Sequence, residues 1–388
     1  MGSKIRLLQR PLKYKKSFFL FGPRGTGKTY WIKENLKDAV YIDLLDMEVY
    51  ALLAANPHRL LDFIPQNYDG WIVIDEVQKI PELLNEVHRL IEKNHSTFVL
   101  TGSSARSLRK KGVNLLAGRA LVYHLYPLTA QELGDDFELK KSLAYGTLPA
   151  ILSEPDPKAY LKAYVTTYLR EEVLQEGLTR NLAAFTRFLE TASFSQGQIL
   201  NMSTIARETA ISQKNVSNYF DILDDLLIGY RLPIFTKKAK RKTIQHPKFY
   251  FFDAGVYQSI RPQGFSEVQA EIDGVALETL FLSALRAIND YYELDYQLSY
   301  WRTVTGLEVD FIVYGPKGFY AFEIKRSRNV SPHDAKGLRA FRQDFPDAAL
   351  YLIYCGDQTY YFGDVKVLPI KEALLKLPQI LSTTEQKT

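Results

Sequence analysis

The sequence is poor in several residue types and patterns, and each shortage excludes a class of protein. Cys355 is the single cysteine among 388 residues, which excludes an internal disulfide and a cysteine-based zinc site and favours a reducing compartment. The six histidines show no metal-ligand spacing, and no apolar run reaches the ~18 residues of a membrane span. The N-terminus lacks an apolar signal-peptide core, and Arg6 breaks the myristoylation pattern. We therefore expect a cytoplasmic protein without a membrane partner.

Charge is unevenly distributed along the chain. The net charge is only +5, and 46% apolar with 24% charged residues is ordinary for a globular protein with a sizeable core. Two clusters of basic residues create local positive fields of the kind that attracts polyanions. The first cluster lies in an acid-free stretch and comprises Lys237, Lys238, Lys240, Arg241, Lys242 and Lys248. The second comprises Arg106, Arg109, Lys110, Lys111 and Arg119.

The spacing of apolar residues predicts the organisation of the N-terminal half. A chain of 388 residues is long enough for two or three domains. Up to about residue 130, short apolar runs alternate with helical patterns such as Pro81–Lys93, which predicts a parallel α/β sheet. The apolar runs are Ser17–Phe21, Val40–Asp43, Trp71–Asp75, Thr97–Thr101 and Ala120–Tyr126. From about 130 to 195 the pattern is mostly helical, with a break at Gly146–Pro149.

The stretch "FFLFGPRGTGKTYW" contains a phosphate-binding loop. Its "GPRGTGKT" has the G-x-x-x-x-G-K-[ST] spacing and stands between an apolar strand and a helical pattern. Glycines let backbone N–H groups turn toward phosphates, and the helix N-terminus adds partial positive charge. Lys28 would contact the β- and γ-phosphates of ATP, and Thr29 would bind Mg²⁺. The predicted nucleotide-binding residues are Gly22, Pro23, Arg24, Gly25, Thr26, Gly27, Lys28, Thr29 and Tyr30.

A second ATPase motif follows in "GWIVIDEVQ". The apolar strand Trp71–Ile74 ends in Asp75, which would hold Mg²⁺ directly or through water, and Glu76, which would act as general base on the attacking water. In "FVLTGSSA", Ser103 or Thr101 would contact the γ-phosphate or that water. The alternative for Ser103 is a helix cap.

An arginine from a neighbouring subunit can complete such a site, because its charge stabilises the transition state and is worth ~10³–10⁵ in rate. Arg119 in "LLAGRA" is our first candidate, followed by Arg106 and by Arg170 in "YLREEV". The alternative for each is an ordinary surface or nucleic-acid-facing arginine. An arginine supplied in trans requires at least a dimer, so we expect a homo-oligomer.

The segment "MSTIARETAISQKNVSNYFDILDDLLIGYRL" predicts a helix-turn-helix. Ser203 or Thr204 would cap the first helix and Ser212 the second. The first helix would pack through Ile205 and Ala206. The second would bury Val216, Tyr219, Ile222, Leu223 and Leu226.

A winged helix of this kind would place polar and basic residues on DNA. The exposed start of the second helix holds Gln213, Lys214, Asn215 and Ser217. The basic stretch Lys237–Lys248 would form the wing between apolar strands and grip phosphates. The predicted DNA contacts are Lys214, Asn215, Lys237, Lys238, Lys240, Arg241 and Lys242. The alternative is a unit that serves only domain packing or oligomerisation.

Near the C-terminus, "GLEVDFIVYGPKGFYAFEIKRS" predicts two strands joined by a Gly-Pro turn. Asp310 lies on the first strand, and the i, i+2 spacing of Glu323 and Lys325 puts both on one face of the second. Carboxylates and a lysine on neighbouring strands are what a metal-dependent nuclease of the restriction-enzyme type needs. Glu278 would start a preceding helix and complete the predicted nuclease site. The alternative is the same fold without cleavage, its charges forming a solvated or salt-bridged edge.

These motifs stand in an order that resembles a large family of bacterial and archaeal AAA-type P-loop ATPases. The matching stretches are "GPRGTGKT", "IVIDEVQKIP", "LTGSSA", "LAGRA", "YLREEV", the helix-turn-helix and "LEVDFIV…AFEIKRS", over roughly residues 10–370. Family members carry a C-terminal domain of unassigned function with a restriction-endonuclease-like core, and AAA-type relatives often form rings. The resemblance implies an extra strand between the two motif-bearing strands. It also implies that the ATP-site roles carry over to Lys28, Thr29, Asp75 and Glu76. Thr147 departs from the family's "GG-x-P"-like segment.

The prediction is thus an α/β chain with a P-loop AAA-type ATPase domain, a winged helix-turn-helix and a C-terminal α/β restriction-endonuclease-like domain. We place the ATPase core at 1–130, a helical lid or connector at 131–195, the winged helix at 196–262, the PD-(D/E)xK-like domain at 263–375 and a tail at 376–388.

Three functions remain open at this point. The leading one is an ATPase that binds and remodels DNA, including branched or junction DNA. The second is an ATP-gated, metal-dependent DNA nuclease in defence or repair, and the third is a nucleotide-switched DNA-binding regulator. The expected cofactors are ATP and Mg²⁺, and the expected partner is DNA.

Overall fold

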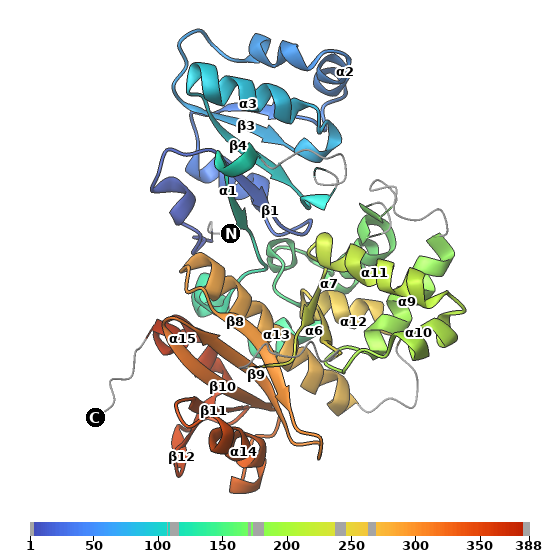
Figure 1. The fold of residues 1–388 in the computed structure, drawn as a ribbon, viewed down its shortest axis with the longest axis vertical. Coiled ribbons are helices and arrows are strands. Elements are labelled where there is room, and N and C mark those ends of the chain that lie inside the picture. Colours follow the sequence, from blue (N-terminus) through green and yellow to red (C-terminus); the bar gives the residue numbers. More distant parts are fainter. Residues whose placement is uncertain are drawn as a thin grey trace. The chain divides into compact units, whose positions relative to one another are not determined.

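The computed structural model describes residues 4–106, 108, 116–169, 172–173, 182–236, 246–262 and 269–382. They form two compact units (Figure 1). The first unit is Ile5–Tyr126 with Asp225–Ile228, and the second is built mainly from Pro127–Asp224 and Gly229–Thr388. None of the helices in these ranges combines the length and the apolar character needed to cross a membrane.

A five-stranded parallel sheet forms the centre of the first unit, in the order β2-β3-β4-β1-β5. Its strands are β1 (Phe18–Phe21), β2 (Val40–Asp43), β3 (Trp71–Asp75), β4 (Thr97–Gly102) and β5 (Leu121–His124). The helices are α1 (Lys28–Asn35), α2 (Met47–Ala55) and α3 (Leu83–Asn94), with the 3₁₀ turns η1 (Arg10–Leu12), η2 (Pro57–Phe63), η3 (Val77–Lys79) and η4 (Leu116–Gly118). All five predicted strands are confirmed, and β4 separates β1 from β3, as the resemblance implies.

The register of this sheet brings the two ATPase motifs to one edge. Phe21 pairs with Gly102, and Asp43 pairs with Asp75. Because all the strands are parallel, their carboxyl ends meet there, which is where open α/β sheets bind ligands.

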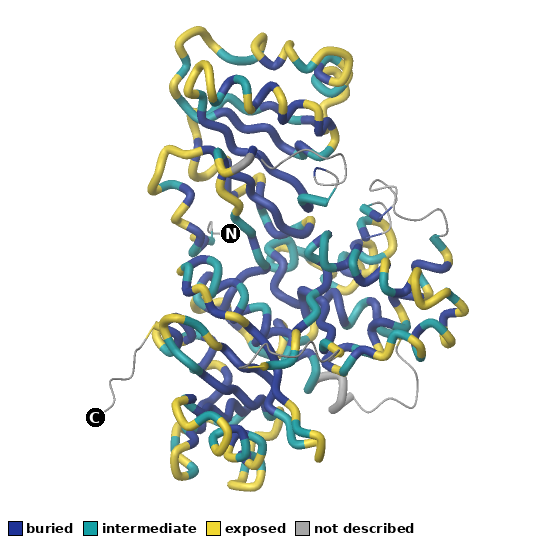
Figure 2. Tube along the Cα trace, viewed as in Figure 1, coloured by how far each residue is buried: buried dark blue, intermediate teal, exposed yellow. Residues whose placement is uncertain are grey.

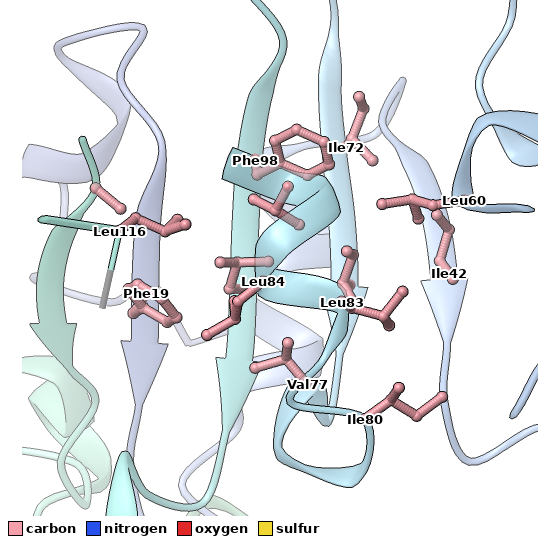
Figure 3. Packing of buried hydrophobic residues seen from close by; sticks show 14 of the residues in the cluster. Phe19, Ile42, Leu60, Ile72, Val77, Ile80, Leu83, Leu84, Phe98 and Leu116 are labelled. Atoms are coloured by element: carbon pink, nitrogen blue, oxygen red, sulfur yellow. The ribbon is translucent and has the colours of Figure 1, made fainter. Parts of the chain in front are cut away.

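Apolar residues from the strands and from α3 hold the sheet together (Figure 3). Leu83, Leu84, Val87 and Leu90 recur with helical spacing along α3 and are fully buried. They pack with Phe19, Ile72 and Phe98 from three different strands. Each such side chain contributes about 1.5–3 kcal/mol when fully buried. The packed core therefore holds the strands in register, and their carboxyl ends stay together at the edge where the motifs meet.

The second unit begins with short helices. They are α5 (Ala130–Leu133), η5 (Gly134–Asp136), α6 (Leu139–Tyr145), η6 (Pro149–Leu152), α7 (Pro157–Ala163), the π-helical turn η7 (Tyr164–Tyr168) and α9 (Leu182–Phe194). The predicted break is present at Gly146, whose φ of +75° favours glycine. A Cβ there would lie 1.9 Å from Oδ1 of Asp253, which caps α12 (Ala254–Ile260).

The predicted pair of helices is present as α10 (Met202–Thr209) and α11 (Gln213–Asp225), followed by the antiparallel strands β6 (Gly229–Leu232) and β7 (Lys248–Phe251). The predicted cap of α10 was wrong. Asn201, and not Ser203 or Thr204, accepts the hydrogen bond from the helix, because its side chain reaches the N–H of Thr204 over 3.1 Å. The cap by Ser212 on α11 is confirmed, as are the buried residues Val216, Tyr219, Ile222, Leu223 and Leu226. Ile205 of α10 is buried, and Ala206 is half-buried.

A six-stranded mixed sheet completes the second unit, in the order β12-β13-β11-β10-β9-β8. Its strands are β8 (Gln297–Arg302), β9 (Glu308–Gly315), β10 (Gly318–Lys325), β11 (Ala349–Tyr354), β12 (Tyr360–Phe362) and β13 (Val365–Pro369). The helices are α13 (Gln269–Tyr291), η8 (Pro332–Ala335), α14 (Lys336–Asp344) and α15 (Ile370–Ser382). Figure 2 shows that the strands of both large sheets are mostly buried.

Two predictions for this region have opposite outcomes. The strand-turn-strand is confirmed, because β9 and β10 pair antiparallel with Gly315 opposite Gly318. The helix start at Glu278 was wrong, because α13 begins at Gln269 and Glu278 lies well inside it. The helix continues through Gly274, because an isolated glycine is tolerated inside a helix.

Candidate functional site

The phosphate-binding loop joins β1 to α1. Gly22 passes so close to β5 that a Cβ would lie 2.4 Å from the carbonyl oxygen of Leu125. Gly25 and Gly27 have φ of +83° and +88°, which L side chains rarely adopt. Lys28 is buried, and its Nζ donates to the carbonyl oxygens of Gly22 over 2.7 Å and Pro23 over 3.3 Å. Its ammonium is therefore held over the loop.

The remaining predicted loop residues differ in exposure. Thr26 is buried, and its Oγ1 donates to the carbonyl of Pro23 over 2.8 Å, which stiffens the turn. Arg6, which sequence reasoning missed, donates from Nη1 to the carbonyl of Thr26 over 3.1 Å. Arg24 and Tyr30 are exposed. A positive charge and an aromatic ring are therefore accessible beside the loop.

Asp75 at the end of β3 is buried and accepts hydrogen bonds from three hydroxyl groups. Thr29 donates to Oδ2 over 3.0 Å, and Tyr41 also donates to Oδ2. Thr101 donates to Oδ1. Burial, together with the bond to Asp75, raises the pKa of Tyr41 well above its ordinary value, so this phenol keeps its proton. The sequence motifs did not reveal Tyr41. The feature that could have pointed to it is its position near the end of β2, the strand that pairs with β3.

Glu76 follows Asp75 with a backbone that is unusual for a residue with a side chain. Its φ of +61° lies in the left-handed region, and such conformations gather at functional sites. The turn directs the carboxylate to Gln78, whose Nε2 donates to Oε2 of Glu76. The N–H of Glu76 donates to Thr101 Oγ1 over 3.3 Å. A half-buried carboxylate is thus fixed next to the Asp75 cluster.

The other predicted catalytic residues have mixed surroundings. Ser103 follows β4 and is buried, and its Oγ makes no hydrogen bond within the described part of the chain. Arg119 donates from Nε to Glu92, and Arg106 donates from Nη1 to Asp225. Arg170 lies outside the described residues. Their predicted catalytic roles stay predictions.

A second cluster of charges lies in the second unit and contains the four residues of the predicted nuclease site. Asp310 on β9 accepts a backbone hydrogen bond from Ile324 over 2.8 Å. Glu323 and Lys325 on β10 contact each other over 2.6 Å between Oε1 and Nζ, as their spacing predicts. Glu278 on α13 accepts from the hydroxyl of Tyr250 over 2.8 Å.

Burial and mutual repulsion shape the charge of these carboxylates. Burial first, and then the negative charge of Asp310, raise the pKa of both Glu278 and Glu323 to about 8. Burial also raises the pKa of Asp310. Oε2 of Glu323 makes no hydrogen bond within the described residues.

Lys248 belongs to this cluster and not to the predicted wing, which is a correction. Its side chain is only 4% exposed and forms an ion pair with Glu308, while its Nζ lies 3.8 Å from Oδ1 of Asp310. The signal that would have revealed this is the two-residue strand period, which puts Lys248 and Tyr250 on one face of β7. The other predicted wing residues, Lys237, Lys238, Lys240, Arg241 and Lys242, lie outside the described residues. Lys214 and Asn215 are exposed in the first turn of α11.

The two sites differ in how they suit a divalent cation. Hydroxyl and carboxylate oxygens from Thr29 and Asp75 suit Mg²⁺, which takes one or two protein ligands together with substrate phosphates. Across the described ranges, no group of three or more Asp, Glu, His or Cys side chains is arranged to hold a metal ion. Glu278, Asp310 and Glu323 therefore do not form such a group.

Three segments of the chain match models of protein families. Residues 14–134 match the AAA domain family (AAA_14), residues 136–267 match a domain of unknown function (DUF8612), and residues 273–373 match another (DUF4143). The phosphate loop and the strand order agree with the similarity of residues 14–134 to the AAA domain family.

Similar proteins occur in bacteria and archaea. The chain is 28% identical to the uncharacterized protein Rv2008c of Mycobacterium tuberculosis over 391 residues, which cover 97% of this chain and 83% of the relative. It is 24% identical to the uncharacterized protein MJ1544 of Methanocaldococcus jannaschii over 351 residues, which cover 81% of this chain and 77% of the relative. The solved structure of a signal-transduction ATPase with a tetratricopeptide repeat sensor from Pyrococcus horikoshii was also matched, with 15% sequence identity and a TM-score of 0.23. The match covers 76% of this chain and 48% of the Pyrococcus chain.

Proposed function

We propose that the chain binds Mg²⁺ and ATP at the Gly22–Tyr30 loop and hydrolyses the ATP. The observation that carries this proposal is the 3.0 Å hydrogen bond between Thr29 and Asp75. It brings together the two predicted magnesium ligands from separate motifs, beside the buried Lys28. The AAA domain match over residues 14–134 supports the same conclusion.

Each side chain has a defined part in this reaction. Bound Mg²⁺ would neutralise phosphate charge between the β- and γ-phosphates. Lys28 would exchange its loop carbonyl partners for phosphate oxygens, which are stronger acceptors for an ammonium. Thr29 and Asp75 would orient the metal, and Glu76 would polarise the attacking water once Gln78 releases its carboxylate.

Two further residues would act on the γ-phosphate. Ser103 offers a buried hydroxyl without a protein partner in the described chain, which suits a contact to the phosphate or the water. Arg119 would reach the site of a neighbouring subunit in a homo-oligomer after leaving Glu92, with which it forms a partly exposed ion pair. Such a pair is worth little, so the exchange costs little.

We also propose that the second unit binds DNA and that ATP turnover remodels it, including branched or junction DNA. The exposed Lys214 and Asn215 at the start of α11 support this, since a recognition helix contacts DNA through its first turns. The regulator hypothesis shares this surface and differs by predicting slow hydrolysis and sequence-selective binding. The nuclease hypothesis is less well supported, because the carboxylates of its site do not form a group arranged to hold a metal ion.

The test is steady-state ATP hydrolysis in Mg²⁺, with and without duplex, single-stranded and four-way junction DNA. The same samples are analysed on a gel, with Lys28→Ala as the control. Stimulation by DNA that stays intact supports a remodelling ATPase. Turnover unaffected by any DNA, together with no binding at moderate salt, contradicts the DNA part of the proposal and leaves the ATPase part to be judged by Lys28→Ala.

A further inference from the structure

Lys248 is a buried ammonium inside a cluster of carboxylates, and the ATPase site does not involve it. It comes from β7, whereas the acids come from α13, β9 and β10 of the same unit. Its Nζ contacts the carboxylates of Glu308 and Asp310 on β9. It also lies 5.5 Å from the centre of the Tyr300 ring on β8, where a cation is attracted by the aromatic face.

The surroundings of Lys248 keep it charged. Burial lowers the pKa of its ammonium, but the charges of Asp310, Glu278 and Glu308 outweigh that effect and raise the pKa above its ordinary value. An isolated buried ammonium would be strongly unfavourable, so its position requires these acids. Glu308 and Asp310 in turn have this ammonium within ion-pair distance, and it offsets their negative charge.

Protein groups already occupy most of the carboxylate oxygens that a metal would use. Oε1 of Glu308 is bonded to Lys248, and its Oε2 accepts from Arg302 over 3.0 Å. Oδ2 of Asp310 accepts from the N–H of Ile324. Tyr250 donates to Oε2 of Glu278, and Lys325 donates to Oε1 of Glu323.

A divalent cation between these acids would lie within a few ångströms of the Lys248 ammonium. Like charges at such a distance repel strongly in a buried place, where water screens them poorly. Lys248 cannot turn its ammonium into the solvent, because its side chain is only 4% exposed and contacts residues of β8 and β9. The ammonium therefore holds the position that a metal would need.

We propose that Lys248 is a built-in cation that pairs with Glu308 and Asp310 and excludes Mg²⁺ and Mn²⁺ from this cluster. The cluster is then an electrostatic joint that fastens β7 to the six-stranded sheet, and not a hydrolytic centre. Removing the ammonium opens a site for a divalent cation, formed by carboxylate oxygens of the kind that Mn²⁺ prefers. This inference is independent of the proposed ATPase.

Lys325 provides a matched control. It also forms an ion pair with an acid of the cluster, yet its side chain is 35% exposed, whereas that of Lys248 is 4% exposed. Lys248→Met and Lys325→Met each remove one ammonium and keep an unbranched side chain that is one atom shorter. The proposal predicts that only Lys248→Met creates a metal site.

The experiment is a titration of the full-length chain with Mn²⁺ in the absence of nucleotide, followed by electron paramagnetic resonance of the free ion. All variants carry Asp75→Asn, which silences the ATP site. We expect no bound Mn²⁺ in the parent or in Lys325→Met. We expect one Mn²⁺ per chain in Lys248→Met, at least about tenfold tighter than any residual binding to the parent, and its loss when Asp310→Asn is added.

Two results would overturn the proposal. One is Mn²⁺ binding by the parent that disappears when Asp310→Asn is added, because the natural cluster would then accept a metal beside Lys248. The other is a folded Lys248→Met that binds none. If Lys248→Met does not fold, Lys248→Gln replaces it, and the comparison of the parent with Asp310→Asn still decides whether the natural cluster excludes the metal.

Discussion

Thr29 and Asp75 lie 46 positions apart in the sequence, yet Oγ1 of Thr29 donates to Oδ2 of Asp75 over 3.0 Å. The parallel sheet creates this contact, because β1 and β3 end at the same edge with β4 between them. Lys28 directly precedes Thr29 and donates from Nζ to the carbonyl oxygen of Gly22 in the loop. The contact therefore joins the two sequence motifs into one site.

Removing the hydroxyl of Thr29 should weaken magnesium binding. In Thr29→Val we expect the Mg²⁺ concentration for half-maximal ATP turnover to rise at least about 10-fold, because one of two protein ligands is lost. Thr29→Ser keeps the hydroxyl and should stay close to wild type. Equal Mg²⁺ dependence in Thr29→Val and wild type would contradict the assignment of Thr29 as a ligand.

Glu76 should affect turnover and not nucleotide binding. Glu76→Gln keeps the shape of the side chain but cannot accept a proton, so we expect turnover to fall by ~10²–10⁴ with ATP affinity unchanged. Turnover is measured as phosphate release, and affinity with a fluorescent ATP analogue. The exposed Glu48→Gln is the control for loss of one acid in the same unit. A variant that retains turnover would show that another group activates the water.

Buried Asp253 should make stability depend on pH. Its carboxylate accepts the N–H groups of Thr147 over 2.8 Å and Val256 over 3.0 Å. Burial nevertheless raises the pKa of Asp253 from 3.8 to about 6. A raised pKa means that the folded chain binds the proton more tightly, so the stability contribution is full below pH 3.8 and is lost as the pH rises through about 6.

Urea unfolding of wild type and Asp253→Asn across this pH range checks the prediction. A shift of this size corresponds to about 3 kcal/mol, so the free energy of unfolding of wild type should fall by about that amount relative to the variant. The variant lacks the titrating group, but it leaves one backbone N–H without an acceptor and is less stable at low pH. Parallel pH profiles for the two proteins would contradict the assigned role of Asp253.

The exposed start of α11 should contact DNA phosphates. In Lys214→Ala we expect weaker binding to duplexes of any sequence. The slope of the logarithm of the binding constant against the logarithm of the salt concentration should also become shallower by about one. The comparison is Lys376→Ala, which removes an exposed lysine of α15 in the same unit. Equal losses in the two variants, measured by fluorescence anisotropy at several salt concentrations, would show that α11 is not the contact surface.

Much of the candidate ATP site could be predicted from the sequence, because its residues lie in two contiguous motifs. The spacing from Gly22 to Thr29 requires a strand, a tight turn and a helix, and these are present. The contribution of Tyr41 could not be predicted, since it depends on β2 lying beside β3. The same holds for Gln78, which reaches Glu76 only because the backbone turns at that point.

The second cluster was predictable only in part. Asp310, Glu323 and Lys325 follow from a strand pattern, and the register of β9 and β10 brings them together. Lys248 ends a basic run in the sequence, so it resembled a surface residue. Its burial depends on the packing of β7 against residues from about 30 to 60 positions further along the chain, such as Glu278 and Asp310, and local composition carries no information on that.

The most direct measurement is phosphate release from ATP by wild type and by Lys28→Ala in Mg²⁺, with equal amounts of folded protein. We predict Mg²⁺-dependent release by wild type and a loss of at least about 10²-fold in Lys28→Ala, because the ammonium is needed at the developing phosphate charge. Equal release by the two proteins, or no release and no ATP binding by wild type, would contradict an ATPase built on this loop.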